Sequence, residues 1–206
     1  IYDYFTKMNN PSNRRFCLVL VKPSHYDDDG YVIQWFRSAI PSNSLACLYG
    51  LALECAEQKI LGESVEFEIH AFDETNTHIN PKKIISLIEK ADDGMVMLVG
   101  VQSNQFPRAL DIARPLREKN IKTALGGFHV SGTMAMLKER DTHVQTALEM
   151  GVSLFAGEAE GRLALVLKDA FSQNLKPIYN FMDDLPNIEG APTPLLPAER
   201  VHLTAG

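Results

Sequence analysis

The sequence predicts an α/β fold built around a doubly wound parallel sheet. Short apolar runs recur along the chain without the alternation of a half-exposed strand, which is typical of strands buried on both faces. Segments with helical spacing of apolar residues separate these runs, and glycine or small polar residues follow them. Because parallel strands need a crossover between them, this alternation indicates a parallel sheet covered by helices.

The first half of the chain contains two of the expected strands. Residues 16–21 are apolar throughout and are expected to form a strand buried on both faces. A long connection follows, typical of a functional insertion, before a helix that is expected to run to about residue 59 with Ser44 as its N-cap. Residues 65–71 alternate between apolar and polar, which predicts a half-exposed strand at or near a sheet edge. Asn80-Pro81 is expected to open the next helix.

The second half supplies three more strands. They are expected at residues 95–101, 121–125 and 152–156. Helices are expected to start near Pro107, Thr142 and Gly161, and Pro115 is expected to kink the first of them. Five strands alternating with helices predict a flavodoxin-like fold with the strand order 2-1-3-4-5.

The chain divides into three parts by composition. Residues 1–15 are polar and lack periodicity, so they are expected to be a lead-in segment. Residues 16–175 carry the expected α/β domain. Residues 176–206 are rich in proline without an apolar period, which predicts an extended linker leading out of the domain. Because the chain starts at Ile1 without methionine, it is expected to be a fragment of a longer protein.

Composition limits the classes of function. The net charge of −6 argues against a nucleic-acid or anionic-membrane surface. No apolar run approaches the length of a membrane helix, and no signal-peptide pattern is visible. The three cysteines fit no zinc or iron–sulfur spacing and are expected to be reduced, buried thiols in a cytoplasmic protein.

Three loops that follow predicted strands are candidates for ligand binding. They contain Ser103-Asn104, Gly126-Gly127 and Gly157-Glu158. Open α/β sheets bind ligands beyond the carboxyl ends of their strands, and glycine lets the backbone approach a ligand closely. The alternative is that the glycine pair only forms a tight turn, and that Glu158 only interacts with the dipole of the next helix. No nucleotide-binding glycine motif is present.

Two of the six histidines lie at the expected mouth of this site. His25 follows the first strand, and His129 follows the glycine pair. Imidazole at either position could ligate a metal or donate a hydrogen bond. The other four are expected to have no functional role, since His70 and His78 are expected at the surface or at a strand end, and His143 and His202 lie in polar segments.

Three blocks together resemble a known family. The first is Val99-Gly100-Val101-Gln102-Ser103, and the second is Leu125-Gly126-Gly127-Phe128-His129. The third runs from Gly151 to Glu160 and is similar to the family's block that ends in G-E-x-E. In this order and spacing they resemble the amino-terminal cobalamin-binding domain of cobalamin-dependent radical S-adenosylmethionine proteins. That family includes anaerobic magnesium-protoporphyrin monomethyl ester cyclases and many methyltransferases.

The resemblance implies a mode of cofactor binding. The corrin ring would lie over the carboxyl ends of the strands, and the nucleotide tail would pass into the sheet edge. Ser103 would contact the tail, and Gly126-Gly127 would leave room for it. The full set of cofactor-binding residues implied in this way is Ser24, His25, Ser103, Asn104, Gly126, Gly127, Phe128, His129, Gly157 and Glu158.

The resemblance also places part of the enzyme outside this chain. Of the family's signature D-x-H-x-x-G, the segment after the first strand keeps the histidine, and His25 is the candidate axial ligand of cobalt. No C-x-x-x-C-x-x-C motif occurs, so S-adenosylmethionine and a [4Fe-4S] cluster are expected only in a downstream radical domain. The chain is not expected to be catalytically active alone.

The sequence therefore predicts a cobalamin-binding module that serves a radical enzyme, in methyl transfer or oxidative cyclisation. The alternative is a structural or substrate-recognition domain of such an enzyme that has lost cobalamin binding. A free-standing flavodoxin-like enzyme or a signalling receiver is a weaker alternative, because Lys22-Pro23-Ser24 lacks the acidic residues of a receiver.

Overall fold

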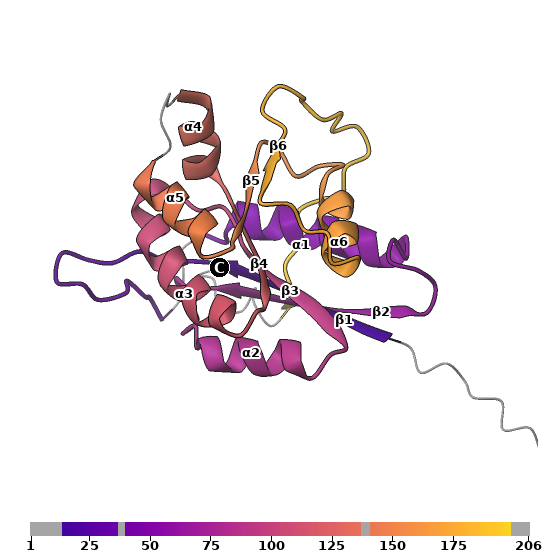
Figure 1. The fold of residues 1–206 in the computed structure, drawn as a ribbon, viewed down its shortest axis with the longest axis horizontal. Coiled ribbons are helices and arrows are strands. Elements are labelled where there is room, and N and C mark those ends of the chain that lie inside the picture. Colours follow the sequence, from indigo (N-terminus) through magenta and orange to yellow (C-terminus); the bar gives the residue numbers. More distant parts are fainter. Residues whose placement is uncertain (1–13, 37–39, 137–140, 199–206) are drawn as a thin grey trace, which may run out of the picture.

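A six-stranded parallel sheet forms the centre of the molecule in the computed structural model, which describes residues 14–36, 40–136 and 141–198 (Figure 1). The strands lie in the order β2-β1-β3-β4-β5-β6. Their bounds are β1 Arg14–Lys22, β2 Val65–Asp73, β3 Asp93–Leu98, β4 Lys122–Gly126, β5 Ser153–Ala156 and β6 Ile178–Asn180. The predicted α/β class and the relative order of the first five strands are confirmed, and β6 is an addition to them.

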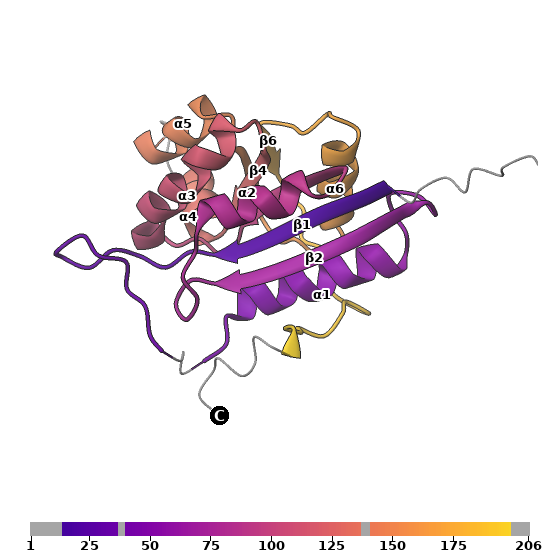
Figure 2. The same cartoon turned by 90° about the horizontal axis from the view of Figure 1, so that it is seen from below.

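Helices cover both faces of the sheet. Their bounds are α1 Asn43–Glu57, α2 Pro81–Glu89, α3 Phe106–Glu118, α4 Phe128–Met136, α5 Thr142–Glu149 and α6 Leu163–Phe171, with a short 3₁₀ turn η1 at Ser103–Gln105. Helices α1 and α6 pack on one face, and α2, α3 and α5 pack on the other (Figures 1 and 2).

The alternation of side chains along β1 shows why the central strands are apolar throughout. Phe16, Leu18 and Leu20 join the apolar cluster beneath α1 and α6. Cys17 and the two valines that alternate with these residues join the cluster beneath the opposite helices. Successive residues of a strand point to opposite faces, so a strand between two helical layers needs apolar side chains at every position.

Strand β2 lies at the edge of the sheet, as its alternating sequence predicts. Among the described strands it pairs with β1 alone, with Arg14 opposite Val65 and Lys22 opposite Asp73. The glutamates of β2 are at least partly exposed. The period-two pattern therefore identified both the strand and its position.

Two elements depart from the expectation. The segment after Gly127 forms α4, although no helix is expected there. Residues 178–180 pair with β5, so the proline-rich segment begins only after a sixth strand. Further along, the Leu195 amide donates to the Ala46 carbonyl oxygen at 3.1 Å, which brings this segment back across α1. Three residues after a proline carry too little period to predict a strand.

Helix α3 continues through Pro115 to Glu118, although the proline is expected to interrupt it. Five of its apolar side chains are fully buried, which holds the helix in place despite the missing amide donor. They are Phe106, Ala109, Ile112, Ala113 and Leu116.

Cys17 and Cys55 are buried free thiols, as predicted, whereas Cys47 is half-buried. Burial raises the pKa of Cys17 to about 12 and that of Cys55 to about 11, so both stay protonated at neutral pH.

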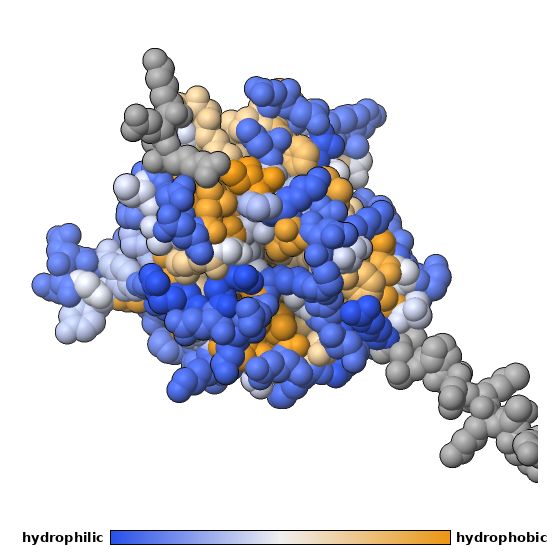
Figure 3. Space-filling model, in the orientation of Figure 1, coloured by the Kyte–Doolittle hydropathy of each residue, from blue (hydrophilic) through white to orange (hydrophobic). Residues whose placement is uncertain are grey.

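Within the described part of the chain, every helix is too short or too polar to cross a bilayer. On the face seen in Figure 3, apolar residues reach the surface in separate patches among hydrophilic ones.

Candidate functional site

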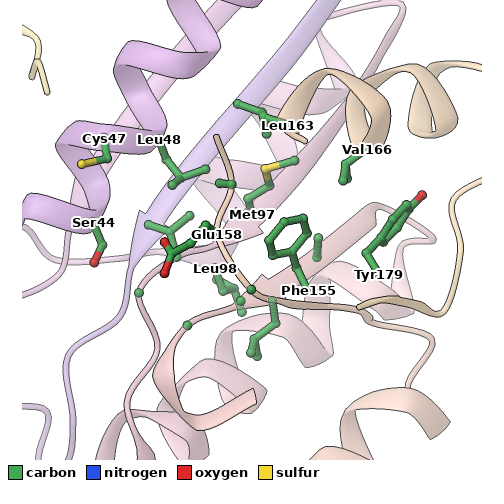
Figure 4. A pocket seen from close by; sticks show the side chains of 18 of the residues that line it. Ser44, Cys47, Leu48, Met97, Leu98, Phe155, Glu158, Leu163, Val166 and Tyr179 are labelled. Carbon is green, nitrogen blue, oxygen red and sulfur yellow. The ribbon is translucent and has the colours of Figure 1, made fainter. Parts of the chain in front are cut away.

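A cavity of about 320 Å³ lies at the carboxyl ends of the central strands, between the sheet and helices α1 and α6. Figure 4 shows side chains from both helices and from the sheet surrounding one space. This is the edge at which parallel α/β sheets bind ligands, and the volume falls near the lower end of the roughly 300–1,000 Å³ of ligand pockets.

Alternate residues of the strands form the floor of the cavity. Met97 of β3, Ala124 of β4 and Phe155 of β5 lie on the same face of the sheet and line the space. Helix α1 contributes Leu48, and helix α6 contributes two further apolar side chains, Leu163 and Val166. The walls are therefore mostly apolar, which suits a flat, poorly hydrated ligand group.

Tyr179 of β6 closes one end of the cavity (Figure 4). Its hydroxyl donates to Asp169 Oδ2 at 2.8 Å and accepts from the Lys176 amide at 3.1 Å. Burial and the nearby Asp169 carboxylate raise the pKa of Tyr179 to about 12, so the phenol is neutral. The ring is fixed by these contacts, and only its apolar surface is offered to the cavity.

The opposite end of the cavity is polar. Ser44 and Cys47 of α1 and Glu158 from the loop after β5 lie there (Figure 4). Burial, with Glu160 and Glu158 nearby, raises the pKa of the Cys47 thiol. This rim therefore carries hydroxyl, thiol and carboxylate groups that can hydrogen-bond a ligand.

The glycine turn after β4 brings two strand-end loops into contact. The Val101 amide donates to the Gly126 carbonyl oxygen at 3.0 Å, and the His129 amide donates to the Val101 carbonyl oxygen at 3.1 Å. At Gly127, φ is +143°, and a Cβ atom would lie 2.2 Å from the Val101 nitrogen. Gly127 is therefore required by the chain's own backbone, whereas a Cβ at Gly126 would meet the Phe155 carbonyl oxygen at 3.2 Å, a closeness that small shifts can relieve.

Four of the ten residues proposed from the sequence line this cavity: Gly126, Gly127, Gly157 and Glu158. Phe128 and Asn104 are exposed and do not line it. Ser103 and His129 do not line the cavity. The Ser103 hydroxyl lies 3.1 Å from His129 Nδ1, and the His129 ring packs on Phe106, which belongs to the core cluster on the opposite side of the sheet.

Ser24 and His25 belong to the long connection after β1, outside the cavity. Ser24 is fully buried, and its hydroxyl donates to the Ile33 carbonyl oxygen at 2.5 Å. Its amide donates to Glu74 Oε2 at 3.1 Å. The His25 carbonyl oxygen accepts from the Ile33 amide at 2.9 Å, which closes this part of the connection on itself.

A buried ion pair holds this connection against the domain. Arg108 of α3 contacts both carboxylate oxygens of Glu74, with Nη2 2.6 Å from Oε1. The Glu74 side chain is 1% exposed and that of Arg108 is 15% exposed. Although burial lowers it, hydrogen bonds to Glu74 and Tyr26 raise the pKa of Arg108 above its usual value. Tyr26 also donates to Asp111 at 2.7 Å, so the connection is attached at several points.

A second cavity, of about 380 Å³, lies between the edge strand β2 and helix α2. It is lined by Phe72 of β2, by residues of α2 and by the segment before this helix, with His78, Lys83 and Lys90 among them. No glycine turn opens onto it, and the ends of the central strands do not contribute. The cavity at the strand ends is therefore the better candidate for cofactor binding.

Sequence reasoning missed the apolar floor of the cavity. The period-two rule places Met97 and Phe155 on one face, so these two could have been found once the strands were assigned. Tyr179 could not, because it lies on a strand too short to predict.

Comparison of the chain with protein-family models, with curated proteins and with solved structures finds no match. The case for function therefore stands on the geometry of the site.

Proposed function

We propose that this domain binds cobalamin and serves a radical S-adenosylmethionine domain elsewhere in the same protein. The observation that carries the proposal is the apolar cavity at the carboxyl ends of β3, β4 and β5, which opens beside the Gly126-Gly127 turn. The resemblance in sequence implies that the nucleotide tail of the cofactor enters the sheet at this turn.

The residues present fit such a tail. A cavity of about 320 Å³ can hold a heterocyclic base but is too small for a corrin ring. Met97, Phe155 and Tyr179 provide apolar contact for a flat base, and Gly126 leaves one wall without a side chain. The amino-terminal end of α1 lies at the rim, where the positive end of the helix dipole favours a phosphate group. The resemblance implies that Ser103 contacts the tail, but Ser103 does not line the cavity. In this proposal Ser44 and Glu158 make that contact instead.

Bound cobalamin would supply a cobalt centre that can carry a methyl group or support another step beside a radical. The chain's own contribution is to bind and orient the cofactor, with the corrin over the strand ends. His25, in the connection after β1, would be the residue that ligates the cobalt.

The second candidate is a structural or substrate-recognition domain without cofactor. The observation that favours it is the connection after β1, whose polar groups are bonded within the chain: Ser24 to Ile33 and Glu74, and Tyr26 to Asp111. A connection that is bonded in this way has fewer groups left to contact a corrin.

Retention of hydroxocobalamin distinguishes the two candidates. The purified chain is mixed with the cofactor, separated from the excess by gel filtration, and examined by visible spectroscopy. We expect shifted corrin bands that stay with the protein. Ala124→Phe should fill the cavity and abolish retention, whereas Lys82→Ala, on the exposed surface of α2, should not.

Two further variants complete this experiment. Ala159→Trp blocks the cavity from a half-buried loop position, so it serves if Ala124→Phe fails to fold by circular dichroism. His25→Ala should change the spectrum of the bound cofactor if His25 ligates cobalt, and leave it unchanged otherwise. A wild-type chain that releases all cofactor on gel filtration would reject the proposal in favour of the structural role.

A further inference from the structure

Three potential metal ligands meet on the face of the sheet opposite the cavity. They are His129 on α4, Asp141 at the N-cap of α5, and His143 in the first turn of α5. His129 Nε2 lies 3.5 Å from Asp141 Oδ1, and His143 Nδ1 lies 3.9 Å from the same oxygen. One ligand atom from each residue falls within 4.8 Å of the other two.

The spacing is close to that of a loaded site. Zinc bonds of about 2.05 Å in tetrahedral geometry separate neighbouring ligand atoms by about 3.3 Å. The two separations from Asp141 exceed this value by little, and the two imidazole nitrogens lie within 4.8 Å of each other, so rotations of the side chains would bring the three atoms around one ion.

A buried nitrogen without a partner points into this group. The His129 side chain is 10% exposed, and among the described residues its Nε2 atom has no hydrogen-bond partner. Its nearest contact is the 3.5 Å ion pair with Asp141 Oδ1, which is longer than an ordinary hydrogen bond. Buried polar atoms are nearly always paired, and an unpaired one calls for an explanation such as an ion.

The other ring nitrogen of His129 is already engaged. Nδ1 lies 3.1 Å from Ser103 Oγ, and a proton on Nδ1 donated to that hydroxyl leaves the lone pair of Nε2 directed at the group. Metal-binding histidines are oriented in this way by a hydrogen bond from their second nitrogen. The Phe106 ring packs at 4.5 Å from the His129 ring and 5.9 Å from the His143 ring, which restricts both imidazoles.

Asp141 supplies negative charge to the group. Its Oδ1 accepts from the amides of His143 and Val144 at 2.8 and 3.3 Å as the cap of α5. The carboxylate places an anionic oxygen beside both imidazoles, although the positive end of the short α5 helix opposes a cation there.

We propose that His129, Asp141 and His143 bind a divalent transition-metal ion, with Ser103 as a positioning residue. Two imidazoles and one carboxylate suit zinc and its first-row neighbours better than calcium or magnesium, which prefer oxygen ligands. The His143 side chain is 49% exposed, so a fourth position faces solvent and can take water or a ligand. None of the three residues lines the cavity, and the metal site is therefore independent of the proposed cobalamin site.

The described residues contain one other group of this kind, Cys17 with Glu68 and His70. It is a weaker candidate for a metal site. Its imidazole already bonds Glu68 at 2.7 Å, and burial raises the pKa of the Cys17 thiol to about 12. A protonated thiol is a poor ligand, and no unpaired nitrogen points into that group.

Zinc binding to the full chain tests the proposal. The protein is stripped with a chelator, and Zn²⁺ is titrated in competition with a chromophoric chelator. We expect one tight site. Loss of a ligand in His129→Ala or His143→Ala should weaken binding by about 100-fold or more, and Ser103→Ala by about 10-fold through loss of ring orientation. His78→Ala, an exposed histidine outside the group, is the matched control and should bind like the wild type.

Asp141→Asn separates the ligand from the helix cap. Asparagine is as good an N-cap as aspartate, so the variant should unfold like the wild type without metal yet lose zinc affinity. Cobalt(II) added in place of zinc gives a second readout, since a tetrahedral site colours the protein and the His129→Ala protein should stay colourless. Equal zinc affinity in the wild type and all three ligand variants, or no binding beyond weak surface association, would overturn the proposal.

Discussion

At the scale of single residues, the buried ion pair of Glu74 and Arg108 holds the connection after β1 against the domain. The two residues are 34 positions apart, and the pair joins the end of β2 to α3 with three short contacts. It also anchors the amide of Ser24. Burying both charges is costly, and the cost is offset because nearly every bonding position of the carboxylate is used.

Removing the charge of Glu74 should therefore be severe. Glu74→Gln leaves the Arg108 guanidinium buried without its counter-charge, and we expect a loss of about 3–5 kcal/mol in the free energy of unfolding in urea. Glu63→Gln removes one side of the exposed pair with Lys59 and should cost less than about 1 kcal/mol. Equal effects of the two variants would show that the buried pair contributes no more than a surface one.

At the scale of elements, β6 and α4 are the two that complete the candidate sites. Strand β6 brings Tyr179 to the end of the cavity, and α4 carries His129 into the metal-ligand group. Both elements are short, and each depends on contacts with the rest of the chain. Tyr179 is held by Asp169 of α6, and the first turn of α4 is held by the carbonyl oxygen of Val101.

The anchoring of β6 can be measured at Tyr179. Tyr179→Phe removes the bond to Asp169 and should cost about 1 kcal/mol. Tyr179→Leu keeps part of the apolar volume, whereas Tyr179→Ala empties it and should cost about 3–5 kcal/mol, as large aromatic truncations do. Urea unfolding of the three variants measures this order. An alanine variant as stable as the phenylalanine one would mean that β6 does not pack as described.

At the scale of the whole molecule, the sheet separates two candidate sites. The cavity lies under α1 and α6, and the group of His129, Asp141 and His143 lies on the side of α3 and α5. The Gly126-Gly127 turn is the point where they come closest along the chain, because Gly127 lines the cavity and His129 follows two residues later.

This separation predicts that the two sites act independently. Ala124→Phe should abolish cobalamin retention and leave zinc affinity within about twofold of the wild type, since changes at separate sites without shared partners are nearly additive. His143→Ala should do the reverse. Loss of both cobalamin retention and zinc affinity in either variant would instead indicate that the turn at Gly126-Gly127 couples the two sites.

Elements that depend on side chains close together in the sequence could be predicted, and elements that depend on distant contacts could not. Two strands could be assigned from sequence, at residues 16–21 and 65–71. A strand buried on both faces is apolar throughout, and a strand buried on one face alternates, so the local order of side chains shows which is present. The cap of α2 at Asn80 was equally local. Helix α4 could not be assigned, because its apolar residues show no helical period and its position depends on contacts with residue 101.

For the candidate sites the same rule holds. The glycines and Glu158 were found because they follow predicted strands, and Gly127 proved to be fixed by backbone contact. His143 was expected to be an unremarkable polar residue, since nothing near it in the sequence indicates that His129 folds against it. The pairing of Ser103 with His129 likewise joins two loops that are 26 residues apart.

The sequence by itself determined the α/β class, the order of the first five strands and the edge of the sheet at which the candidate cavity lies. These follow from side-chain periodicity and from the geometry of parallel strands, which act within each segment. Only the tertiary structure decided which side chains meet: the Glu74–Arg108 pair, the floor of the cavity and the two histidines at Asp141. These contacts join residues from different elements and depend on how the helices pack across the sheet, so the sequence of one segment does not predict them.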